Sequence, residues 1–220
     1  MLLGNYEDGI SFCCRAFLIQ ENTIGPTHPD IVQTLNNLAG LYKCVGKFEE
    51  ALQLYLRALK ITICKDGRES LETAQILNNL SELYINTEKY KKGIFICKKA
   101  LKIRKSMLGN KHPYVATILN NLGLLYYQIN EWDKVLPLYQ EALAIYENSN
   151  LKDHSQLIPV LSNVADYYKS NQEFDKSIEC RKQALHIARD KLGFNHPYFI
   201  VIKLSLISLL NELEMQLEHK

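Results

Sequence analysis

A repeat of 42 residues runs through most of this 220-residue chain. The motif Asn-Asn-Leu at 36–38 returns at 78–80 and 120–122, and Ser162-Asn163-Val164 continues the series. Two further columns keep the same interval, and they hold Tyr42, Tyr84, Tyr126 and Tyr168 and, in the second, Ala58, Ala100, Ala142 and Ala184. Self-similarity at a fixed period of this length is the signature of stacked structural repeats.

Each period is predicted to form a helical hairpin. In the first half of a period, Leu35, Leu38, Ala39 and Tyr42 follow the spacing i, i+3, i+4 and i+7, which places them on one face of an α-helix. Apolar positions with the same spacing begin again at Phe48, so we expect a second amphipathic helix about four residues after the first one ends.

Helix ends are marked by glycine, proline and histidine. Pro29, Pro113 and Pro197 are predicted to open first helices, where a missing N–H group costs nothing. The glycines predicted to close the preceding helices are Gly25, Gly67, Gly109 and Gly193. We expect the histidine before each proline to cap the helix start.

The whole chain, 1–220, is predicted to be a single array. It divides into a half repeat at 1–27, full repeats at 28–69, 70–111, 112–153 and 154–195, and a terminal half repeat at 196–220. The last helix shows an apolar stripe at Leu204, Ile207, Leu210 and Leu213. Helices without partners at both ends leave two interpretations open, a segment of a longer array or self-association through the open ends.

Composition and charge argue against several classes of function. Lys and Arg number 26 against 24 for Asp and Glu, so the net charge of +2 does not indicate nucleic acid or a membrane as the main partner. No segment has the pattern of a signal peptide or a membrane span, so a cytoplasmic location is expected. The six cysteines form no metal-binding or disulfide pattern, and we expect reduced thiols.

The column set resembles the tetratricopeptide repeat, on the residues Leu35-x-x-Leu38-Ala39-x-x-Tyr42, Gly46, Phe48, Ala51, Tyr55 and Ala58. The connection Leu-Gly-x-x-His-Pro at 108–113 and 192–197 is similar to that of kinesin light chains and nephrocystin. The resemblance implies an all-α, right-handed superhelical solenoid of helical hairpins. It also implies an adaptor or scaffold that binds an extended peptide or partner segment in a concave groove.

One face of the first helices remains after the packing positions are assigned. At 100° per residue, positions 35, 38, 39 and 42 face the hairpin partner, and positions 33, 36, 37, 40 and 43 are left. Stacked repeats turn such faces into a continuous groove. The predicted groove residues are Gln33, Asn36, Asn37, Lys43, Gln75, Asn78, Asn79, Glu82, Thr117, Asn120, Asn121, Asn163, Asp166 and Lys169.

Seven asparagines in this set carry a cost in helix propensity. A carboxamide offers donors and an acceptor, which suits the N–H and C=O groups of an extended peptide. In peptide-binding members of the family these positions hold ligand backbones, and the resemblance implies that role for Asn36, Asn37, Asn78, Asn79, Asn120, Asn121 and Asn163. The alternative is that the asparagines bond to neighbouring helices or turns and stiffen the array.

The resemblance to kinesin light chains also bears on charge preference. Those proteins are associated with acidic cargo peptides that contain an aromatic anchor. In this chain Glu82 and Asp166 offset Lys43 and Lys169, so the predicted groove is not basic.

A second segment of the chain has a strong excess of positive charge. From Glu88 to His112 there are nine lysines and arginines against one acid. Such a patch, represented by Lys98, Lys99 and Lys102, would attract an acidic protein, anionic lipid or nucleic acid. The other interpretation is a solvated helix face with no aromatic side chain among the charges.

Nothing in the sequence predicts an enzyme. His28, His112 and His196 share one repeat position, so at least one hairpin separates each from the next and they are not expected to converge on a metal ion. No metalloprotease, hydrolase or phosphate-binding motif is present. We therefore expect no catalytic residue, metal, cofactor or small-molecule substrate.

Overall fold

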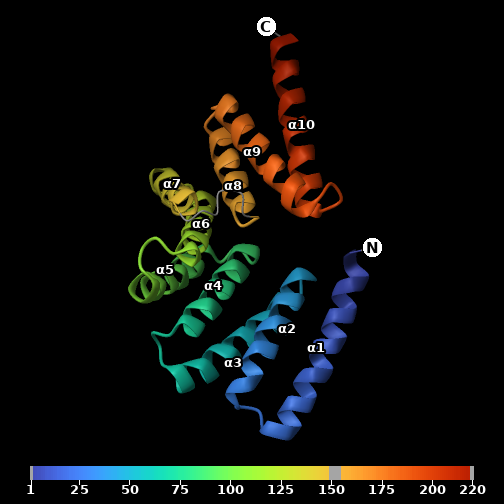
Figure 1. Ribbon diagram of the computed structural model, residues 1–220, viewed down its shortest axis with the longest axis vertical. Helices are drawn as coiled ribbons and strands as arrows, with labels where there is room; N and C mark the ends of the chain where they lie inside the picture. Colours follow the sequence, from blue (N-terminus) through green and yellow to red (C-terminus); the bar gives the residue numbers. More distant parts are fainter. Residues whose placement is uncertain (1, 149–154, 219–220) are drawn as a thin grey trace. The chain divides into compact units, whose positions relative to one another are not determined.

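The computed structural model describes residues 2–148 and 155–218, and these residues form helices with short connections (Figure 1). The all-α class predicted from the repeat is confirmed. The elements are α1 (Leu2–Ile24), the 3-10 turn η1 (Pro29–Ile31), α2 (Val32–Cys44), α3 (Phe48–Asp66), α4 (Leu71–Asn86), α5 (Tyr90–Leu108), α6 (Pro113–Gln128), α7 (Trp132–Asn148), α8 (Leu157–Ser170), α9 (Phe174–Leu192) and α10 (Pro197–Glu218).

The chain forms two compact units, residues 1–110 and residues 111–220. In unit 1, α2 pairs with α3 and α4 pairs with α5, while α1 packs on α2. In unit 2, α6 pairs with α7 and α8 pairs with α9, while α10 packs on α9. Each unit thus contains two helical hairpins and one further helix.

The predicted helix ends are largely confirmed. Gly67, Gly109 and Gly193 follow helices with φ between 82° and 86°, in the left-handed region that favours glycine. Pro113 and Pro197 are the first residues of α6 and α10. Pro29 also opens its helix, but the first turn is a 3-10 turn, closed by a bond from the Ile31 N–H to the His28 carbonyl, and α2 follows directly at Val32.

The three histidines cap helix starts, as expected. The backbone N–H groups of Asp30, Tyr114 and Tyr198 each donate to Nδ1 of the histidine two residues earlier, at 3.2 Å. These contacts satisfy first-turn donors that have no intrahelical partner.

The hairpins pack a large ring against small residues. In unit 1, Ala39, Ala51, Tyr55 and Ala58 are at most 1% exposed and belong to one buried cluster. In unit 2, Tyr139 is fully buried and its ring lies on Gly123 of α6. Small residues let the two helices approach closely, and the tyrosine fills the remaining volume.

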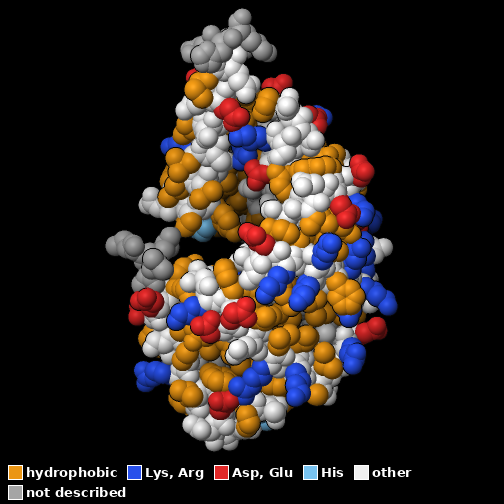
Figure 2. Space-filling view, turned by 180° about the vertical axis from the view of Figure 1, so that it is seen from behind, with side chains coloured by type: hydrophobic (Ala, Val, Ile, Leu, Met, Phe, Trp, Pro, Cys, Tyr) orange, Lys and Arg blue, Asp and Glu red, His pale blue; other side chains and the backbone are white. Residues whose placement is uncertain are grey.

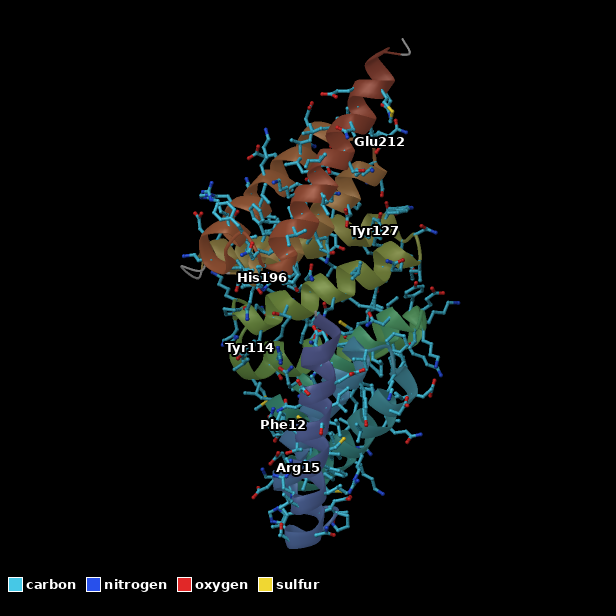
Figure 3. All side chains as sticks on the ribbon, turned by 90° about the vertical axis from the view of Figure 1, so that its right-hand side faces the viewer. Phe12, Arg15, Tyr114, Tyr127, His196 and Glu212 are labelled. Carbon is cyan, nitrogen blue, oxygen red and sulfur yellow. The ribbon has the colours of Figure 1, made fainter. Side chains whose placement is uncertain are left out.

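The end helices expose apolar side chains. Phe199, Ile202, Leu206 and Leu209 are the buried residues of α10. The apolar stripe predicted from the sequence is on a different face of α10 from these buried residues, since Leu204, Ile207 and Leu210 are exposed. Two apolar faces share this helix, and spacing alone does not tell which of them meets α9. On α1, Phe12 is 67% exposed (Figure 3).

No helix in the described ranges is both long enough and apolar enough to cross a lipid bilayer.

The packing of the tyrosines predicts opposite effects for two glycine substitutions. An alanine Cβ at Gly123 would lie 2.5 Å from Cε1 of Tyr139, so Gly123→Ala should lower the free energy of unfolding by about 2 kcal/mol. At Gly40 the added Cβ meets only the Tyr55 hydroxyl at 3.7 Å, an ordinary contact. Gly40→Ala should therefore raise stability by about 0.5–1 kcal/mol through helix propensity. Urea denaturation followed by circular dichroism measures both, and equal effects would contradict the packing.

Candidate functional site

The predicted groove residues lie on the first helices of the hairpins, and hydrogen bonds join them across neighbouring hairpins. In unit 1, Asn79 Nδ2 on α4 donates to Asn36 Oδ1 on α2 at 2.8 Å. In unit 2, Asn163 Nδ2 on α8 donates to Asn120 Oδ1 on α6 at 2.9 Å. We call the surface that carries these residues the amide face of each unit, formed by α2 and α4 in unit 1 and by α6 and α8 in unit 2.

Further amide contacts run along single helices. Gln33 Nε2 donates to Asn37 Oδ1 at 2.8 Å, and Gln75 Nε2 donates to Asn79 Oδ1 at 3.1 Å. These contacts join residues four positions apart, which lie one above the other on a helix. Together with the bonds between hairpins, they are contacts of the kind that the alternative interpretation expects.

The asparagines differ in how far a ligand can reach them. Asn78, Asn120 and Asn121 are buried, with exposures of 3%, 6% and 8%. Asn37 is exposed and Asn36 is half-buried. Both Asn36 and Asn37 accept through Oδ1 in the contacts above, and their amide N–H groups are not engaged in those contacts. Asn36 and Asn37 therefore present N–H donors on the accessible part of the unit 1 amide face.

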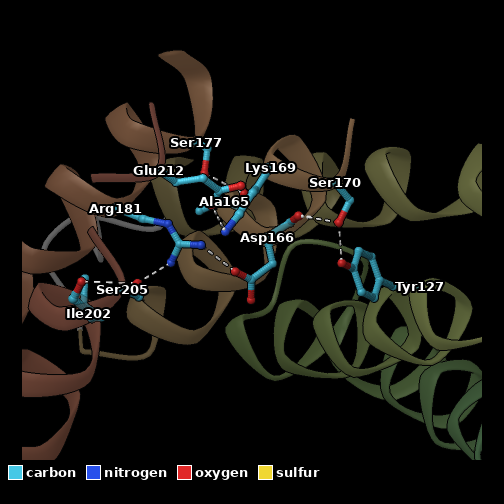
Figure 4. A network of polar contacts seen from close by, with 10 residues as sticks. All are labelled: Tyr127, Ala165, Asp166, Lys169, Ser170, Ser177, Arg181, Ile202, Ser205 and Glu212. Atoms are coloured by element: carbon cyan, nitrogen blue, oxygen red, sulfur yellow. Dashed lines mark hydrogen bonds and ion pairs between the residues drawn. The ribbon is translucent and has the colours of Figure 1, made fainter. Parts of the chain in front are cut away.

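Each charge predicted for the groove has an oppositely charged neighbour. Lys43 Nζ lies 2.6 Å from Glu82 Oε2, and both side chains are partly buried. In unit 2, Lys169 Nζ lies 2.7 Å from Glu212 Oε2 of α10 (Figure 4). The balance of charge expected from the sequence is thus realised in ion pairs, and these pairs link neighbouring helices.

A buried arginine was missed by sequence reasoning. Arg181 occupies the repeat column of Tyr55 and Tyr139, is 7% exposed, and donates from Nη2 to Asp166 Oδ1 at 2.7 Å and from Nη1 to Ser205 Oγ at 2.5 Å (Figure 4). A charge in a column otherwise filled by core residues was the signal that would have revealed it. Burial of a guanidinium requires such partners.

Other polar contacts complete the two faces. In unit 1 the buried Arg104 donates to Gln75 Oε1. In unit 2 the Tyr127 hydroxyl lies 2.6 Å from Ser170 Oγ, and Thr117 lies 3.4 Å from the Tyr146 hydroxyl. Tyr127 was not among the predicted residues, although it occupies the same repeat column as Lys43.

Two pockets open on the amide faces at equivalent repeat positions. The unit 1 pocket has a volume of about 440 Å³ and is lined by Asn36, Asn37, Gly40, Leu41, Lys43, Tyr55 and Asn79. The unit 2 pocket has a volume of about 180 Å³ and is lined by Leu124, Tyr127, Gln128, Tyr139, Asn163, Asp166, Lys169 and Ser170. Residues 40, 43, 55 and 79 of the first match residues 124, 127, 139 and 163 of the second, two periods of 42 residues later.

A tyrosine of the second helix reaches each pocket. Burial is the main cause that raises the pKa of Tyr55 and of Tyr139. The charge of Glu82 adds to the effect on Tyr55, and the charge of Asp166 adds to the effect on Tyr139. Both phenols therefore keep their protons at neutral pH and are able to donate a hydrogen bond.

The basic face of α5 differs from the expectation in one respect. Lys91, Lys92, Lys98, Lys99 and Lys102 are exposed, but so is Phe95, at 61%. Phe95 lies on their face because it is three or four residues from its neighbours in that set. Lys99 Nζ is 4.3 Å from the centre of the Phe95 ring. The prediction that no aromatic side chain lies among the charges was wrong.

Within the described parts of the chain, no group of three or more His, Cys, Asp or Glu side chains is placed to hold a metal ion. Cys97 is fully buried, and burial raises the pKa of its thiol to about 12.

Family comparisons decide what kind of repeat this is. A tetratricopeptide repeat model matches residues 1–63 and 72–148, and a second model of the same repeat matches residues 160–198. The chain belongs to the tetratricopeptide repeat family. Its repeats are of the kinesin light chain type, as the sequence predicted.

Solved structures support the same fold. BtubC (BKLC) from P. vanneervenii is 28% identical, with a TM-score of 0.69 over 88% of this chain and 77% of that one. A putative kinesin light chain from Podosopora anserina, with nearly identical TPR-like repeats, is 17% identical, with a TM-score of 0.67 over 86% of this chain and 89% of that one.

A third structure shows the same fold in a different setting. Aspartyl phosphate phosphatase F from Bacillus subtilis is 16% identical, with a TM-score of 0.67 over 86% of this chain and 48% of that one. The search of curated proteins found no match. Family and fold together support a protein-interaction scaffold, of a kind that is typically not enzymatic.

The bond between Asn79 and Asn36 should contribute measurably to stability. Asn79→Ala is expected to lower the free energy of unfolding by about 1 kcal/mol, and a double-mutant cycle with Asn36→Ala should give a coupling of about 0.5–1.5 kcal/mol. Gln53→Ala, at an exposed position of α3, is the control and should change stability by less than about 0.5 kcal/mol. Strict additivity of the Asn36 and Asn79 effects would show that the bond contributes nothing.

Proposed function

We propose that this protein is an adaptor that binds an extended peptide segment of a partner protein on its amide faces. The observation that carries the proposal is the pair of pockets at equivalent repeat positions, each on an amide face and each reached by a buried tyrosine. Each pocket is lined by amide groups, which suit the N–H and C=O groups of a polypeptide backbone. Cargo recognition of the kinesin light chain kind is the specific form that the repeat type suggests.

The free donors on α2 support binding of backbone carbonyl groups. The amide N–H groups of Asn36 and Asn37 border the pocket, and Lys43 is held there by Glu82. Because the lysine charge is offset, the face has no strong preference for an acidic peptide. The asparagine N–H groups can therefore bind the main chain of a peptide, since every peptide offers carbonyl acceptors whatever its side chains.

A peptide library displayed on phage and selected on the purified protein tests the proposal. Asn37→Ala removes an exposed carboxamide and should weaken binding of a selected peptide by about fivefold, because one hydrogen bond to the ligand is lost. Fluorescence anisotropy with the synthetic peptide measures the affinity. Gln53→Ala on α3 is the matched control and should bind as wild type does.

Two results would contradict the proposal. One is the failure of the library to yield any peptide that binds wild type. The other is a selected peptide whose affinity is the same for Asn37→Ala, Asn36→Ala and wild type, since such a peptide binds elsewhere.

A second candidate is the basic face of α5, and exposed Phe95 is the observation that favours it. An aromatic ring among lysines offers an apolar contact together with the charge, which a merely solvated face lacks. Figure 2 shows Lys and Arg side chains gathered over this part of unit 1, with hydrophobic surface between them. We propose it as a site for an anionic partner.

Charge reversal tests this second site. Lys98→Glu, Lys99→Glu and Lys102→Glu together should abolish binding of a fluorescent poly-glutamate peptide, and wild-type binding should weaken steeply as salt is added, because exposed charges are screened. Charge reversal of the exposed Lys60 and Lys65 on α3 is the control. An affinity for the poly-glutamate peptide that changes neither with salt nor with the α5 substitutions would exclude the site.

A further inference from the structure

The pocket of unit 2 contains a buried polar group that no neighbour satisfies. The Tyr139 side chain is fully buried, and its hydroxyl has no hydrogen-bond partner among the described residues. Buried polar groups in folded proteins nearly always have a partner, and the exceptions call for a ligand, a water molecule or a functional reason. Because the ring lies on Gly123, with Cε1 2.5 Å from the point where an alanine Cβ would stand, it has little freedom to turn elsewhere.

The Tyr139 side chain reaches the pocket from α7. Tyr139 is one of the residues that line it, and the groups whose charges act on the phenol, Asp166 and Tyr127, line the same pocket. Because the phenol stays protonated at neutral pH, Tyr139 brings an O–H donor to the pocket.

The walls of the pocket offer acceptors. Asn163 uses Nδ2 for its bond to Asn120, which leaves Oδ1 open to the pocket. Asp166 accepts from Arg181 through Oδ1, which leaves Oδ2 open. Ser170 Oγ donates to the Asp166 backbone carbonyl, so the Tyr127 hydroxyl is the donor in its contact with Ser170 (Figure 4).

The charges around the pocket cancel. Asp166 is paired with Arg181, and Lys169 is paired with Glu212. A charged ligand group would lose hydration on entry without meeting a net opposite charge. The pocket volume of about 180 Å³ suits one short side chain, or about six water molecules at the volume each has in the liquid.

We infer that this pocket binds the side-chain carboxamide of a glutamine or asparagine in the bound peptide. The carboxamide oxygen accepts from the Tyr139 hydroxyl, and its NH₂ group donates to Asn163 Oδ1 and Asp166 Oδ2. A neutral group with one acceptor and two donors can pair with the Tyr139 hydroxyl and with the two open acceptors at the same time. The inference rests on the proposed function, since it assigns a side-chain preference to the peptide that the amide faces bind.

The equivalent pocket of unit 1 lacks this chemistry. Each carboxamide oxygen that lines it already accepts a hydrogen bond, Asn36 from Asn79, Asn37 from Gln33 and Asn79 from Gln75. Tyr55 stands where Tyr139 stands, but each carboxamide oxygen near it already has one donor, whereas Asn163 Oδ1 has none in the contacts above. Tyr55→Phe is therefore a matched control, because the same atom is removed at the same repeat position.

The experiment uses a peptide selected from the phage library on wild-type protein. Each residue of the peptide is replaced in turn by glutamine, asparagine, glutamate and leucine, and affinities are measured by fluorescence anisotropy for wild type, Tyr139→Phe and Tyr55→Phe. We expect one position at which glutamine or asparagine binds about tenfold more tightly than glutamate or leucine on wild type. That preference should vanish in Tyr139→Phe and persist in Tyr55→Phe.

Folding does not confound the result. Tyr139→Phe removes a hydroxyl without a partner, so its melting temperature should equal or exceed that of wild type. The scan on wild type tests the preference without any protein substitution. The inference is overturned if peptides bind with no carboxamide-selective position, or if the preference survives Tyr139→Phe, in which case the pocket only holds water. If the library yields no binder, the proposed function fails, and the inference fails with it.

Discussion

The contact on which the α2–α3 and α6–α7 hairpins depend is a tyrosine of the second helix packed against a small residue of the first. Tyr55 lies in the buried cluster with Ala39, and Tyr139 lies on Gly123. Because the small residue lets the ring approach, the two helices of the hairpin pack closely. The tyrosine side chain of the second helix then lines the pocket on the amide face. Neighbouring first helices in a unit then come close enough for Asn79 to bond Asn36 and for Asn163 to bond Asn120. The hairpin core and the amide face therefore both depend on the packing of the tyrosine against the small residue.

The same column explains how the units differ. Where the second helix carries Arg181 in place of tyrosine, Asp166 and Ser205 accept hydrogen bonds from its two terminal nitrogens, and the face gains a polar network between α8 and α10. Where it carries Cys97, the side chain is fully buried and adds no phenol to the amide face. One core position thus sets the chemistry of the surface above it, repeat by repeat.

Much of this was accessible from the sequence because the repeat is strict. The all-α class, the hairpin unit, the closing glycines and the capping histidines follow from spacing alone. The face of α10 that meets α9 did not follow, since Leu204 and Ile202 fit helical periodicity equally well and only packing chooses between them. The repeat pattern also did not predict which asparagines are exposed. Asn37 and Asn121 share a column, yet one is exposed and the other is buried.

The central claim is that the amide face, and not the α5 basic face, holds the peptide. The most direct measurement is a two-dimensional ¹H–¹⁵N NMR titration that follows the side-chain NH₂ signals of Asn36 and Asn37 as a selected peptide is added. The account predicts saturable shifts of both signals, with the backbone amides of Lys98 and Lys99 unchanged. Saturable shifts confined to α5, with the asparagine signals fixed, would contradict it.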